Sequence, residues 1–265
     1  MSSGSKAHHV LALSGGVGGA RLARGLARVL PPGDLTIVCN TADDFTHFGL
    51  LICPDIDSVT YALAGLNDEA RGWGVRDESW TVMESLRRIG APDWFLLGDR
   101  DLATHLYRRE LLDRGMSLTD ATAAICRAHG IAARVVPMSD DPVRTIVRTA
   151  DGDLHFQDYF VGRRCEPAVA GFRFDGAETA RPQRDFMELL QSDDLRAIVI
   201  CPSNPFVSVD PILSLAGVRE ALRNRRAPLV AVSPIIGGQA VKGPAAKMLR
   251  ELGLDSSAAA VARHY

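Results

Sequence analysis

Four glycines stand close together near the N-terminus, in the segment Ser14-Gly-Gly-Val-Gly-Gly19. A short apolar run precedes them and an amphipathic helix is predicted to follow, so the segment joins a strand to a helix N-terminus. Glycines let the backbone approach a ligand closely, and the free N–H groups of a helix N-terminus favour a phosphate. The residues expected to bind the phosphates of a substrate are Gly15, Gly16, Val17, Gly18 and Gly19.

This glycine loop departs from the two commonest nucleotide-binding motifs. Ala20 and Arg21 stand where a P-loop has its Gly-Lys-Ser/Thr. Gly16-Val-Gly18 begins a dinucleotide fingerprint, but Arg21 replaces its third glycine, and the next strand ends in Asn40 rather than an acid. The loop therefore favours phosphate over nicotinamide binding, and a tight turn without any ligand is the alternative interpretation.

Aspartates are concentrated in two segments, Asn40-Thr-Ala-Asp43-Asp44 and Pro54-Asp55-Ile-Asp57. The first follows a predicted strand and the second opens a helix, so both belong at the carboxyl edge of the sheet, where open α/β folds bind ligands. Carboxylates from separate loops, facing a diphosphate, are typical of Mg²⁺ sites. The alternative is local structure only, with Asp57 capping its helix and Asp43 forming an Asx turn.

A polar cluster follows in Gly98-Asp99-Arg100-Asp101-Leu-Ala-Thr104-His105, which is predicted to run from a strand end into a helix. Its polar groups lie in the first turn, where a substrate would be positioned. We therefore count Asp99, Arg100, Asp101, Thr104 and His105 as candidate substrate contacts. Two alternatives are open: a lone His on a helix is more often structural, and Asp101 is a candidate helix cap.

Two further loops carry candidate binding groups. Cys201-Pro-Ser203-Asn204-Pro205 follows a buried strand, and its prolines fix a rigid loop that can aim an Asn amide at a nucleobase or ribose. Residues 233–244 form a glycine-rich loop in which Lys242 precedes a helix that starts with Pro, which is a second candidate anion site. For Lys242 the alternative is an ordinary solvated surface position.

The elements that position these residues alternate in the α/β manner. The first 60 residues read as strand, glycine turn, helix and strand, and such a βαβ unit predicts a parallel sheet with right-handed crossovers. We expect a Rossmann-like, mostly parallel sheet flanked by helices in a single domain over residues 1–265. A small α/β insertion with a hairpin is expected at about residues 140–183, because two β-rich runs there flank an Asp-Gly turn.

The predicted elements are most regular before and after that insertion. Residues 40–48 are expected to be a polar loop and residues 163–182 irregular. Strands are predicted at 10–13, 35–39, 94–97, 134–137, 197–201 and 229–232, and helices at 57–66, 77–89, 102–114, 118–129, 185–191, 211–223, 244–252 and 256–265.

Composition limits the class of protein. The chain has 265 residues, a hydrophobic fraction of 46% and a formal net charge of −2, which fits a globular enzyme and argues against a nucleic-acid partner. Residues 1–9 are small and polar, and the apolar run behind them is too short for a signal peptide or a membrane span. Five scattered cysteines without CxxC spacing indicate reduced structural thiols, so we expect a cytoplasmic protein.

Taken together, these segments make the chain resemble the 2-phospho-L-lactate transferase family of coenzyme F420 biosynthesis. The resemblance rests on motifs that run in order over nearly the whole chain. They are the glycine loop to Arg21, Asn40-Thr-Ala-Asp-Asp44, Cys53-Pro-Asp-Ile-Asp57, Arg71-Gly-Trp-Gly74, Arg76-Asp-Glu-Ser-Trp80, Asp93-Trp-Phe-Leu-Leu-Gly-Asp-Arg-Asp-Leu-Ala-Thr-His105, His155-Phe-Gln157, Pro202-Ser-Asn-Pro205 and Ser233-Pro-Ile-Ile236. The long motif from Asp93 is the specific one.

The resemblance implies a transferase whose acceptor is the deazaflavin Fo and whose donor is a guanosine diphosphate carrying a small carboxylic acid. The acid is lactyl in archaea and enolpyruvyl or glyceryl in some bacteria, and GMP leaves as a phosphodiester forms. Such chemistry depends on positioning and charge neutralisation.

The resemblance also implies roles for individual residues. Mg²⁺ would be held near Asp43 and Asp57, the catalytic pair, and Asp55 or Asp44 would be a further ligand or an outer-shell partner; we count Asp55 with the metal ligands. The remaining substrate contacts would be the glycine loop, Asn40, the cluster from Asp99 to His105, Lys242, and Ser203, Asn204 and Pro205 on the guanosine side.

Three expectations concern the whole chain. Members of the family usually continue past the position of Tyr265, so the usual C-terminal segment is expected to be lacking here. A homodimer is the default for a soluble enzyme of this size. The rival function is a non-enzymatic regulator from a related glycine-loop family that binds nucleotide-sugars, and release of GMP distinguishes the two.

Overall fold

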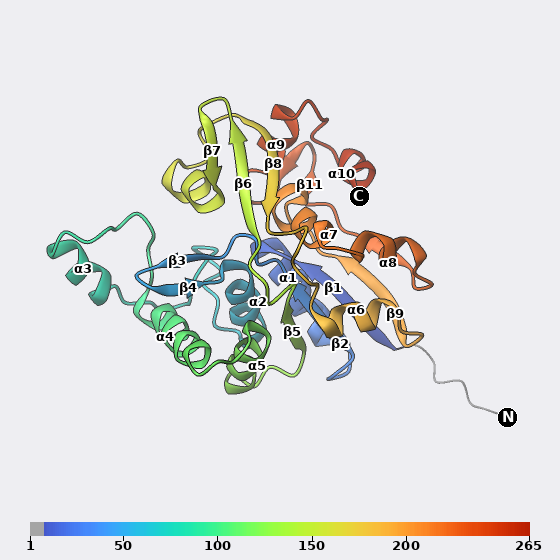
Figure 1. The fold of residues 1–265 in the computed structure, drawn as a ribbon, viewed down its shortest axis with the longest axis horizontal. Coiled ribbons are helices and arrows are strands. Elements are labelled where there is room, and N and C mark those ends of the chain that lie inside the picture. The colour runs from blue at the N-terminus through green and yellow to red at the C-terminus, as the bar shows by residue number, and fades with distance from the viewer. Residues whose placement is uncertain (1–7) are drawn as a thin grey trace.

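A five-stranded parallel sheet forms the centre of the computed structural model, which describes residues 8–265 (Figure 1). Its strand order is β10-β9-β1-β2-β5 and every neighbouring pair is parallel, as the sequence predicted. The strands are β1 (His9–Ser14), β2 (Leu35–Cys39), β5 (Arg134–Pro137), β9 (Leu195–Ile200) and β10 (Leu229–Ala231). The expectation about a signal peptide falls mostly on residues 1–7, which lie outside the described residues.

Helices cover both faces of this sheet, because successive side chains of a strand point to opposite faces. Val10 and Ala12 pack on one side, with α1 (Gly16–Val29), α2 (Pro54–Ala64) and α5 (Leu118–Ala128). Leu11 and Leu13 pack on the other side, with α6 (Arg184–Leu190), α7 (Asp210–Ser214) and α8 (Val218–Asn224). The Rossmann-like prediction is therefore confirmed.

The predicted insertion is present as a separate antiparallel sheet. Strand β6 (Arg144–Thr149) pairs with β7 (Gly152–His155) as the expected hairpin, and also with β8 (Val169–Asp175). The sequence predicted the second strand of the hairpin to run over residues 154–161, but it ends at His155 and the chain turns into a π-helical segment at Asp158–Gly162. The segment 163–182 was also wrongly predicted to be wholly irregular. This sheet packs against α9 (Ala245–Glu251) and α10 (Ala258–His264) through an apolar cluster.

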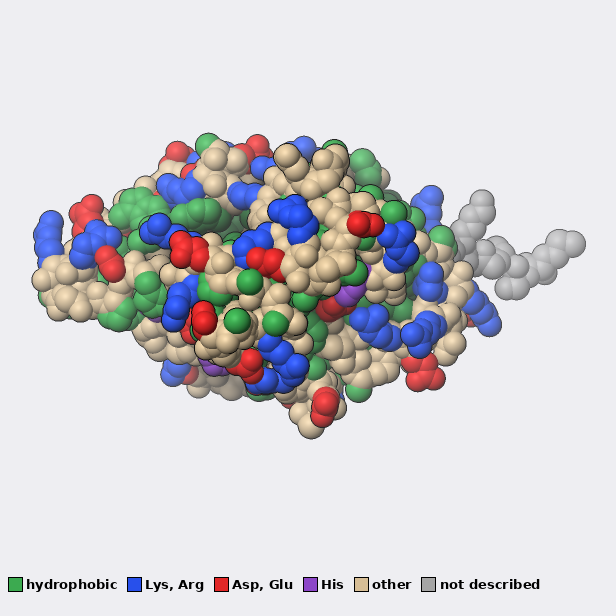
Figure 2. All heavy atoms as spheres, turned by 90° about the horizontal axis from the view of Figure 1, so that it is seen from above, with side chains coloured by type: hydrophobic (Ala, Val, Ile, Leu, Met, Phe, Trp, Pro, Cys, Tyr) green, Lys and Arg blue, Asp and Glu red, His purple; other side chains and the backbone are tan. Residues whose placement is uncertain are grey.

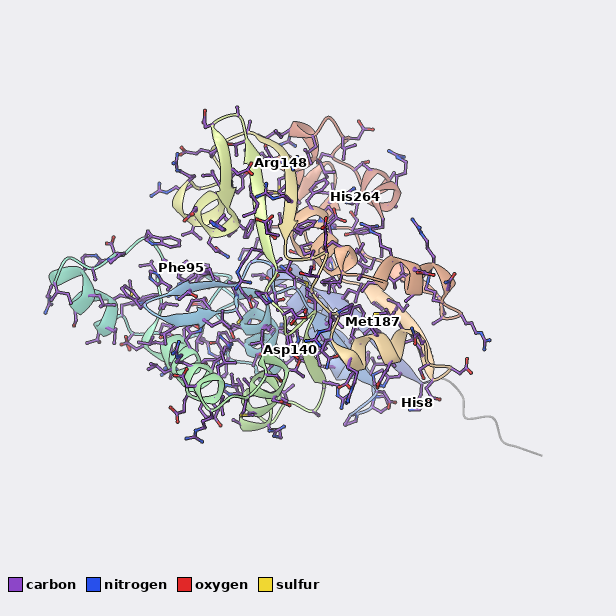
Figure 3. The ribbon with its side chains drawn as sticks, in the orientation of Figure 1. His8, Phe95, Asp140, Arg148, Met187 and His264 are labelled. Carbon is purple, nitrogen blue, oxygen red and sulfur yellow. The ribbon has the colours of Figure 1, made fainter. Side chains whose placement is uncertain are left out.

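A lobe built from residues 45–52 and 65–113, the segments on either side of α2, extends from the sheet (Figure 1). It contains the hairpin β3 (Phe45–His47) and β4 (Leu50–Ile52), followed by α3 (Thr81–Arg88) and α4 (Asp99–Asp113). The polar loop predicted at 40–48 is thus partly a strand. The buried strand predicted at 94–97 is absent, because Trp94 and Leu96 are 38% and 39% exposed, while Phe95 packs edge-on against Phe45 (Figure 3).

Several predicted helix bounds shift in the structure. Helix α2 begins at Pro54 and α4 at Asp99, both earlier than predicted, so the aspartates of these segments lie inside the first helical turn. The helix predicted at 211–223 is two helices, because Gly217 adopts a positive φ of 77° between α7 and α8. The glycine-rich loop 233–244 contains a small hairpin of β11 (Ile235–Ile236) and β12 (Gln239–Ala240).

The surface shows two general features. Positive and negative side chains are intermixed over the face in Figure 2, and hydrophobic side chains gather toward the end that carries α3. The exposed apolar side chains of that lobe include Phe48, Trp73 and Trp94. Within residues 8–265, none of the helices has both the length and the apolar character needed to cross a membrane.

Candidate functional site

The strand order of the sheet reverses between β1 and β9, and the candidate residues gather at the carboxyl ends of these strands. The glycine loop follows β1, Asn40 follows β2, and Ser203 comes directly after β9. The side chain of Asn40 donates to the carbonyl of Val207 over 3.2 Å and so connects two of these segments. Open α/β sheets bind ligands at such a reversal point.

The glycine loop turns straight into helix α1. Gly15 is the N-cap and provides no side-chain cap, and Gly16 adopts a φ of +62°. Ser203 holds Gly15 on both sides: its hydroxyl accepts from the Gly15 amide at 3.1 Å and donates to the Gly15 carbonyl at 2.8 Å. The loop is therefore fixed in place before any substrate binds.

Close packing explains why the loop needs glycine. A Cβ at Gly18 would collide with the carbonyl oxygen of Pro202, and one at Gly19 would collide with the hydroxyls of Ser14 and Ser203. The loop-without-ligand interpretation accounts for these contacts. It does not account for the first turn of α1, where Gly15 provides no capping side chain and the Gly16 amide donates to a buried carboxylate instead.

Asp55 spans from α2 to the glycine loop. Its carboxylate accepts from the Gly16 amide at 2.6 Å and from the Asn40 amide at 2.9 Å, and the residue is 5% exposed. Burial raises the pKa of Asp55 to about 6, although these hydrogen bonds act in the opposite direction. A buried carboxylate thus lies directly at the N-terminus of α1.

Asp43 and Asp44 are buried beside Asp55. One carboxylate oxygen of each, Oδ1, is buried without a hydrogen-bond partner. Burial raises the pKa of Asp43 well above its usual range, and the nearby charge of Asp55 raises it further. Burial likewise raises the pKa of Asp44, against a hydrogen bond from Cys53 and the charge of Arg144. In both residues burial outweighs the groups that stabilise the ionised form, and the charges of Asp55 and Asp44 add to the effect of burial at Asp43.

The donor set fits a divalent cation at Asp43 and Asp55. Both are carboxylates, they repel each other, and Asp43 has an unpartnered oxygen. Mg²⁺ is commonly bound by one or two carboxylates, with substrate phosphates and water completing its shell. Among residues 8–265, no group of three or more His, Cys, Asp or Glu side chains is arranged to hold a metal ion without such help.

Asp57 is in a different position from the other two predicted metal ligands. Its carboxylate receives both terminal nitrogens of Arg108 and lies 3.7 Å from Nδ1 of His105. Asp57 is not an N-cap, since that position belongs to Cys53. Arg108 is missing from the predicted site, and no sequence motif points to it; only its spacing of three residues from His105 places the two on one helix face.

The residues of the cluster from Asp99 to His105 fall into two groups. The first two make contacts within the lobe, and the others surround Tyr61. Asp99 accepts from the hydroxyl of Ser79 and from the amides of Thr81 and Val82, so it caps helix α3. Arg100 donates to the Arg76 carbonyl at 3.3 Å on the surface. The contacts of Asp99 and Arg100 therefore stabilise the structure of the lobe.

The other members of that cluster surround a tyrosine. Asp101 accepts from the Tyr61 hydroxyl at 2.6 Å and lies 3.3 Å from Nε2 of His105. The side chain of Thr104 also hydrogen bonds to Tyr61. Burial raises the pKa of Asp101, but the hydrogen bonds from His105 and Tyr61 outweigh it and lower the pKa overall. Asp101 is not the cap of α4, because Gly98 occupies that position.

Asn204 and Pro205 shape their own loop. The Asn204 side chain accepts from the Phe206 amide at 3.1 Å, and its amide contacts the sulfur of Met248 at 3.2 Å. Pro205 begins a π-helical turn, Pro205–Val209. The structure therefore brings Ser203 onto the glycine loop and engages the Asn204 amide in protein contacts.

Lys242 approaches the same region from the C-terminal hairpin. Its ammonium donates to the Gly72 carbonyl at 2.6 Å, and the group is partly buried rather than fully solvated. Burial, followed by the charge of Arg21, lowers the pKa of Lys242. Lys242 therefore lies close enough to Arg21, a residue of helix α1, for the two positive charges to repel each other.

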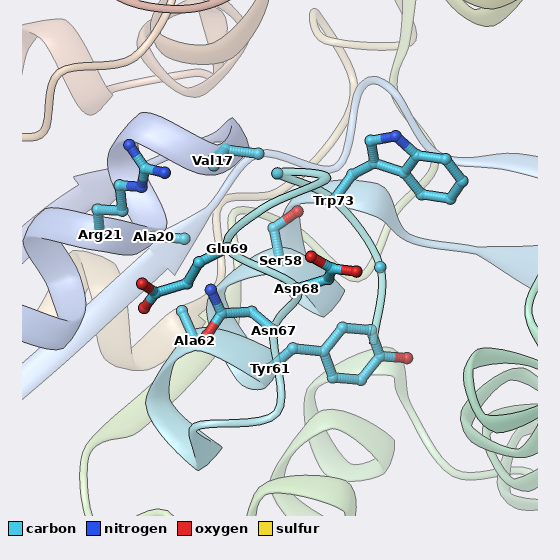
Figure 4. A pocket seen from close by; sticks show the side chains of 12 residues that line it. Val17, Ala20, Arg21, Ser58, Tyr61, Ala62, Asn67, Asp68, Glu69 and Trp73 are labelled. Atoms are coloured by element: carbon cyan, nitrogen blue, oxygen red, sulfur yellow. The ribbon is translucent and has the colours of Figure 1, made fainter. Parts of the chain in front are cut away.

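A small recess lies beside Arg21 (Figure 4). It lies between α1, α2 and the loop of residues 67–74. Arg21, Tyr61 and Trp73 form part of its wall. The remaining lining residues are Val17, Ala20, Ser58, Ala62, Asn67, Asp68, Glu69, Gly72 and Gly74. Val17 is therefore the one residue of the predicted glycine loop that faces this recess.

A family model described as 2-phospho-L-lactate transferase CofD matches residues 10–264. The chain is 44% identical over 261 residues to the phosphoenolpyruvate transferase of Streptomyces griseus, an alignment that covers 97% of this chain and 81% of that protein. It is 41% identical over 256 residues to the 2-phospho-L-lactate transferase of Methanosarcina mazei, covering 97% and 83% of the two chains.

Solved structures share the fold at lower identity. A crystal structure of a member of the UPF0052 family from Bacillus halodurans superposes with a TM-score of 0.60 at 19% identity. The match covers 86% of this chain and 69% of that one. At this identity the likeness confirms the Rossmann-like architecture alone.

Proposed function

Because the chain belongs to the 2-phospho-L-lactate transferase family, we propose that it transfers a phospho-carboxylic acid to the deazaflavin Fo in coenzyme F420 biosynthesis. The donor is a guanosine diphosphate that carries phospholactyl, phosphoenolpyruvyl or phosphoglyceryl, and GMP is released. The single observation that carries the mechanism is the pair of buried, mutually repelling carboxylates Asp43 and Asp55 beside the N-terminus of α1.

The proposed reaction exchanges one phosphorus–oxygen bond for another. The ribityl hydroxyl of Fo attacks the phosphorus that bears the acid, and the bond from that phosphorus to the GMP phosphate oxygen breaks. The hydroxyl proton leaves to solvent or to a carboxylate of the site. The protein mainly positions the two substrates and neutralises charge.

A magnesium ion, when bound, would supply the positive charge that the donor diphosphate needs in its transition state. Asp43 and Asp55 are the residues proposed to hold it, because both are buried and Asp43 presents an unpartnered oxygen. Asn40 orients Asp55 through its side-chain amide. Asp57 is proposed to act through Arg108 instead, as argued in the next subsection.

Hydrogen-bond donors and positive groups of the chain itself lie at the start of helix α1 and beside it, next to the proposed diphosphate position. The amides of the glycine loop lie at the start of helix α1. Burial and the nearby charge of Arg21 together lower the pKa of Lys242. A bound diphosphate would relieve that repulsion. Val17 and Trp73 line the adjoining recess and present apolar surface to a substrate.

Incubation of the protein with Fo, Mg²⁺ and each of the three guanosine diphospho donors tests the proposal, with GMP release measured by chromatography. We expect GMP with at least one donor and none without Fo. No GMP with any of the three donors would overturn the transferase function and favour the nucleotide-binding regulator.

Replacement of Asp43 by Ala tests the cation site separately. We expect Mg²⁺-dependent GMP release to fall at least about 100-fold while the circular dichroism spectrum is retained, because one carboxylate supplies several kcal/mol of charge stabilisation through the ion. Asp93→Ala is the matched control, since Asp93 pairs with Arg87 on the surface of the lobe. Unchanged turnover in Asp43→Ala would remove Asp43 from the site.

A further inference from the structure

Arg108 is among the largest fully buried side chains of the described residues, with 0% exposure. Both terminal nitrogens of its guanidinium donate to the Asp57 carboxylate. One of them also donates to the Leu51 carbonyl at 3.2 Å. It lies 3.1 Å from Nδ1 of His105. A full positive charge is thus held inside the protein by helix α2, by the β3–β4 hairpin and by its own helix α4.

These contacts continue as a buried chain of polar groups. His105 reaches Asp101 through its other ring nitrogen at 3.3 Å, and Asp101 accepts from Tyr61 at 2.6 Å. Tyr61 lines the recess shown in Figure 4. The chain therefore runs from the wall of that recess to Asp57, in the first turn of α2.

Stability alone is a poor explanation for this arrangement. Removing two charges from water offsets most of their attraction, so apolar side chains in place of a buried ion pair often stabilise a protein equally well. Asp57 stands two residues after Asp55 in the same helical turn, and its amide bonds to the Cys53 carbonyl at 2.9 Å. A contact that holds Asp57 in position therefore also restrains Asp55, because both belong to the first turn of α2.

We propose that Arg108 is a positioning residue, which acts through Asp57 to hold the first turn of α2 so that Asp55 faces the Gly16 amide and the candidate cation site. The pairing also keeps the Asp57 carboxylate out of that site. The effect on Asp55 follows from the geometry, and the effect on turnover rests on the proposed function.

Two variants test this inference. Arg108→Lys keeps the charge and loses the two-pronged contact, while the double variant Asp57→Leu with Arg108→Met removes both charges together. Arg114→Met is the matched control, because Arg114 ends the same helix and pairs with Glu110 on the surface. Melting temperature, GMP release and hydrogen–deuterium exchange of peptides covering residues 14–19 and 53–57 are measured for each.

We expect both variants to melt within about 5 °C of the parent, with kcat at least about tenfold lower and a smaller change in the donor KM. Amide exchange in the two peptides should be at least about fivefold faster, and the control should match the parent. If the double variant fails to fold, Arg108→Lys decides alone. Exchange and kcat equal to the parent in Arg108→Lys would overturn the inference. If the parent releases no GMP, the proposed function fails and the exchange data still decide the positioning role.

Discussion

Asp43, Asp55 and Asp57 carry the same side chain but differ in the charge that surrounds them. Arg108 neutralises the negative charge of Asp57, and two amide donors partly stabilise the charge of Asp55. Asp43 has a carboxylate oxygen without a hydrogen-bond partner. Sequence spacing placed all three together, and from the charge around each we rank Asp43 and Asp55 above Asp57 as proposed cation ligands. The ranking depends on an arginine more than 50 residues along the chain.

The carboxylate pair predicts how stability depends on pH in cation-free protein. The pKa of Asp55 rises from its usual 3.8 to about 6, so the folded state binds more protons than the unfolded state between these values. Stability contributed by this group is therefore lost as pH rises from about 4 to about 6, by an amount on the order of 3 kcal/mol.

Replacement of Asp43 by Asn relieves the repulsion in that pair. We expect the variant to melt about 2–4 °C higher than the parent at pH 8 in EDTA, because a gain of about 1 kcal/mol has this effect in a chain of this size. At pH 4.5 the two should melt together, and added Mg²⁺ should stabilise only the parent at pH 8. A lower melting temperature for Asp43→Asn at pH 8 in EDTA would contradict the argument.

Two glycines of helix α1 predict opposite effects of one substitution. Alanine is favoured over glycine in a helix by about 1 kcal/mol. At Gly25 the added Cβ meets nothing within 4 Å, so Gly25→Ala should raise the free energy of unfolding by about 0.5–1 kcal/mol. At Gly18 the Cβ collides with the Pro202 carbonyl, so Gly18→Ala should lower it by at least about 1 kcal/mol. Urea unfolding measures both, and equal effects would refute the packing role of Gly18.

At the scale of elements, helices α3 and α4 cap each other. Asp99, the first residue of α4, accepts from the amides of Thr81 and Val82, which open α3. Glu78, just before α3, accepts from the amides of Arg100 and Asp101 at 2.9 and 2.8 Å. A side chain at Gly98 would collide with the Glu78 carboxylate, which explains the glycine there.

This exchange of caps predicts a local effect of losing them. In Glu78→Ala and Asp99→Ala, hydrogen–deuterium exchange of residues 79–103 should accelerate at least about threefold, because helix N-termini lose their acceptors. The central sheet should exchange as in the parent. Glu84→Ala within α3 is the control, and equal exchange in all three variants would show that the caps are dispensable.

The same elements show what the sequence did and did not predict. Strands β1, β2 and β5 were predicted well, because short apolar runs between turn residues indicate buried parallel strands. Residues 94–97 are a similarly apolar run, but they lie in the lobe, where one side of the run is exposed to solvent and no strand forms. The acceptors of the capping amides come from Glu78 and Asp99, about 20 residues away in the chain. Local patterns cannot reveal such partners, so Asp99 was interpreted as a substrate contact.

At the scale of the whole molecule, the candidate site joins distant parts of the chain. The carboxyl ends of β1, β2 and β9 meet at the reversal of strand order. Lys242, which follows hairpin β11–β12, donates to Gly72 in the wall of the recess beside α1. The sequence predicted the strand ends through the βαβ rule. It gave no means to place residues 233–244, because their position depends on packing of the C-terminal helices. The homodimer stays a prediction.

Lys242 provides the test at this scale, since it contacts Gly72 from 170 residues away. Burial and the charge of Arg21 lower the pKa of Lys242, so an anion placed between the two cations would be favoured. We expect Lys242→Met to weaken GDP binding at least about tenfold by calorimetry, equivalent to about 1.4 kcal/mol. Arg250→Met removes a positive charge from the exposed face of α9 and should bind GDP as the parent does. Equal losses in the two variants would mean that overall charge acts on the nucleotide, and the specific role of Lys242 would then be refuted.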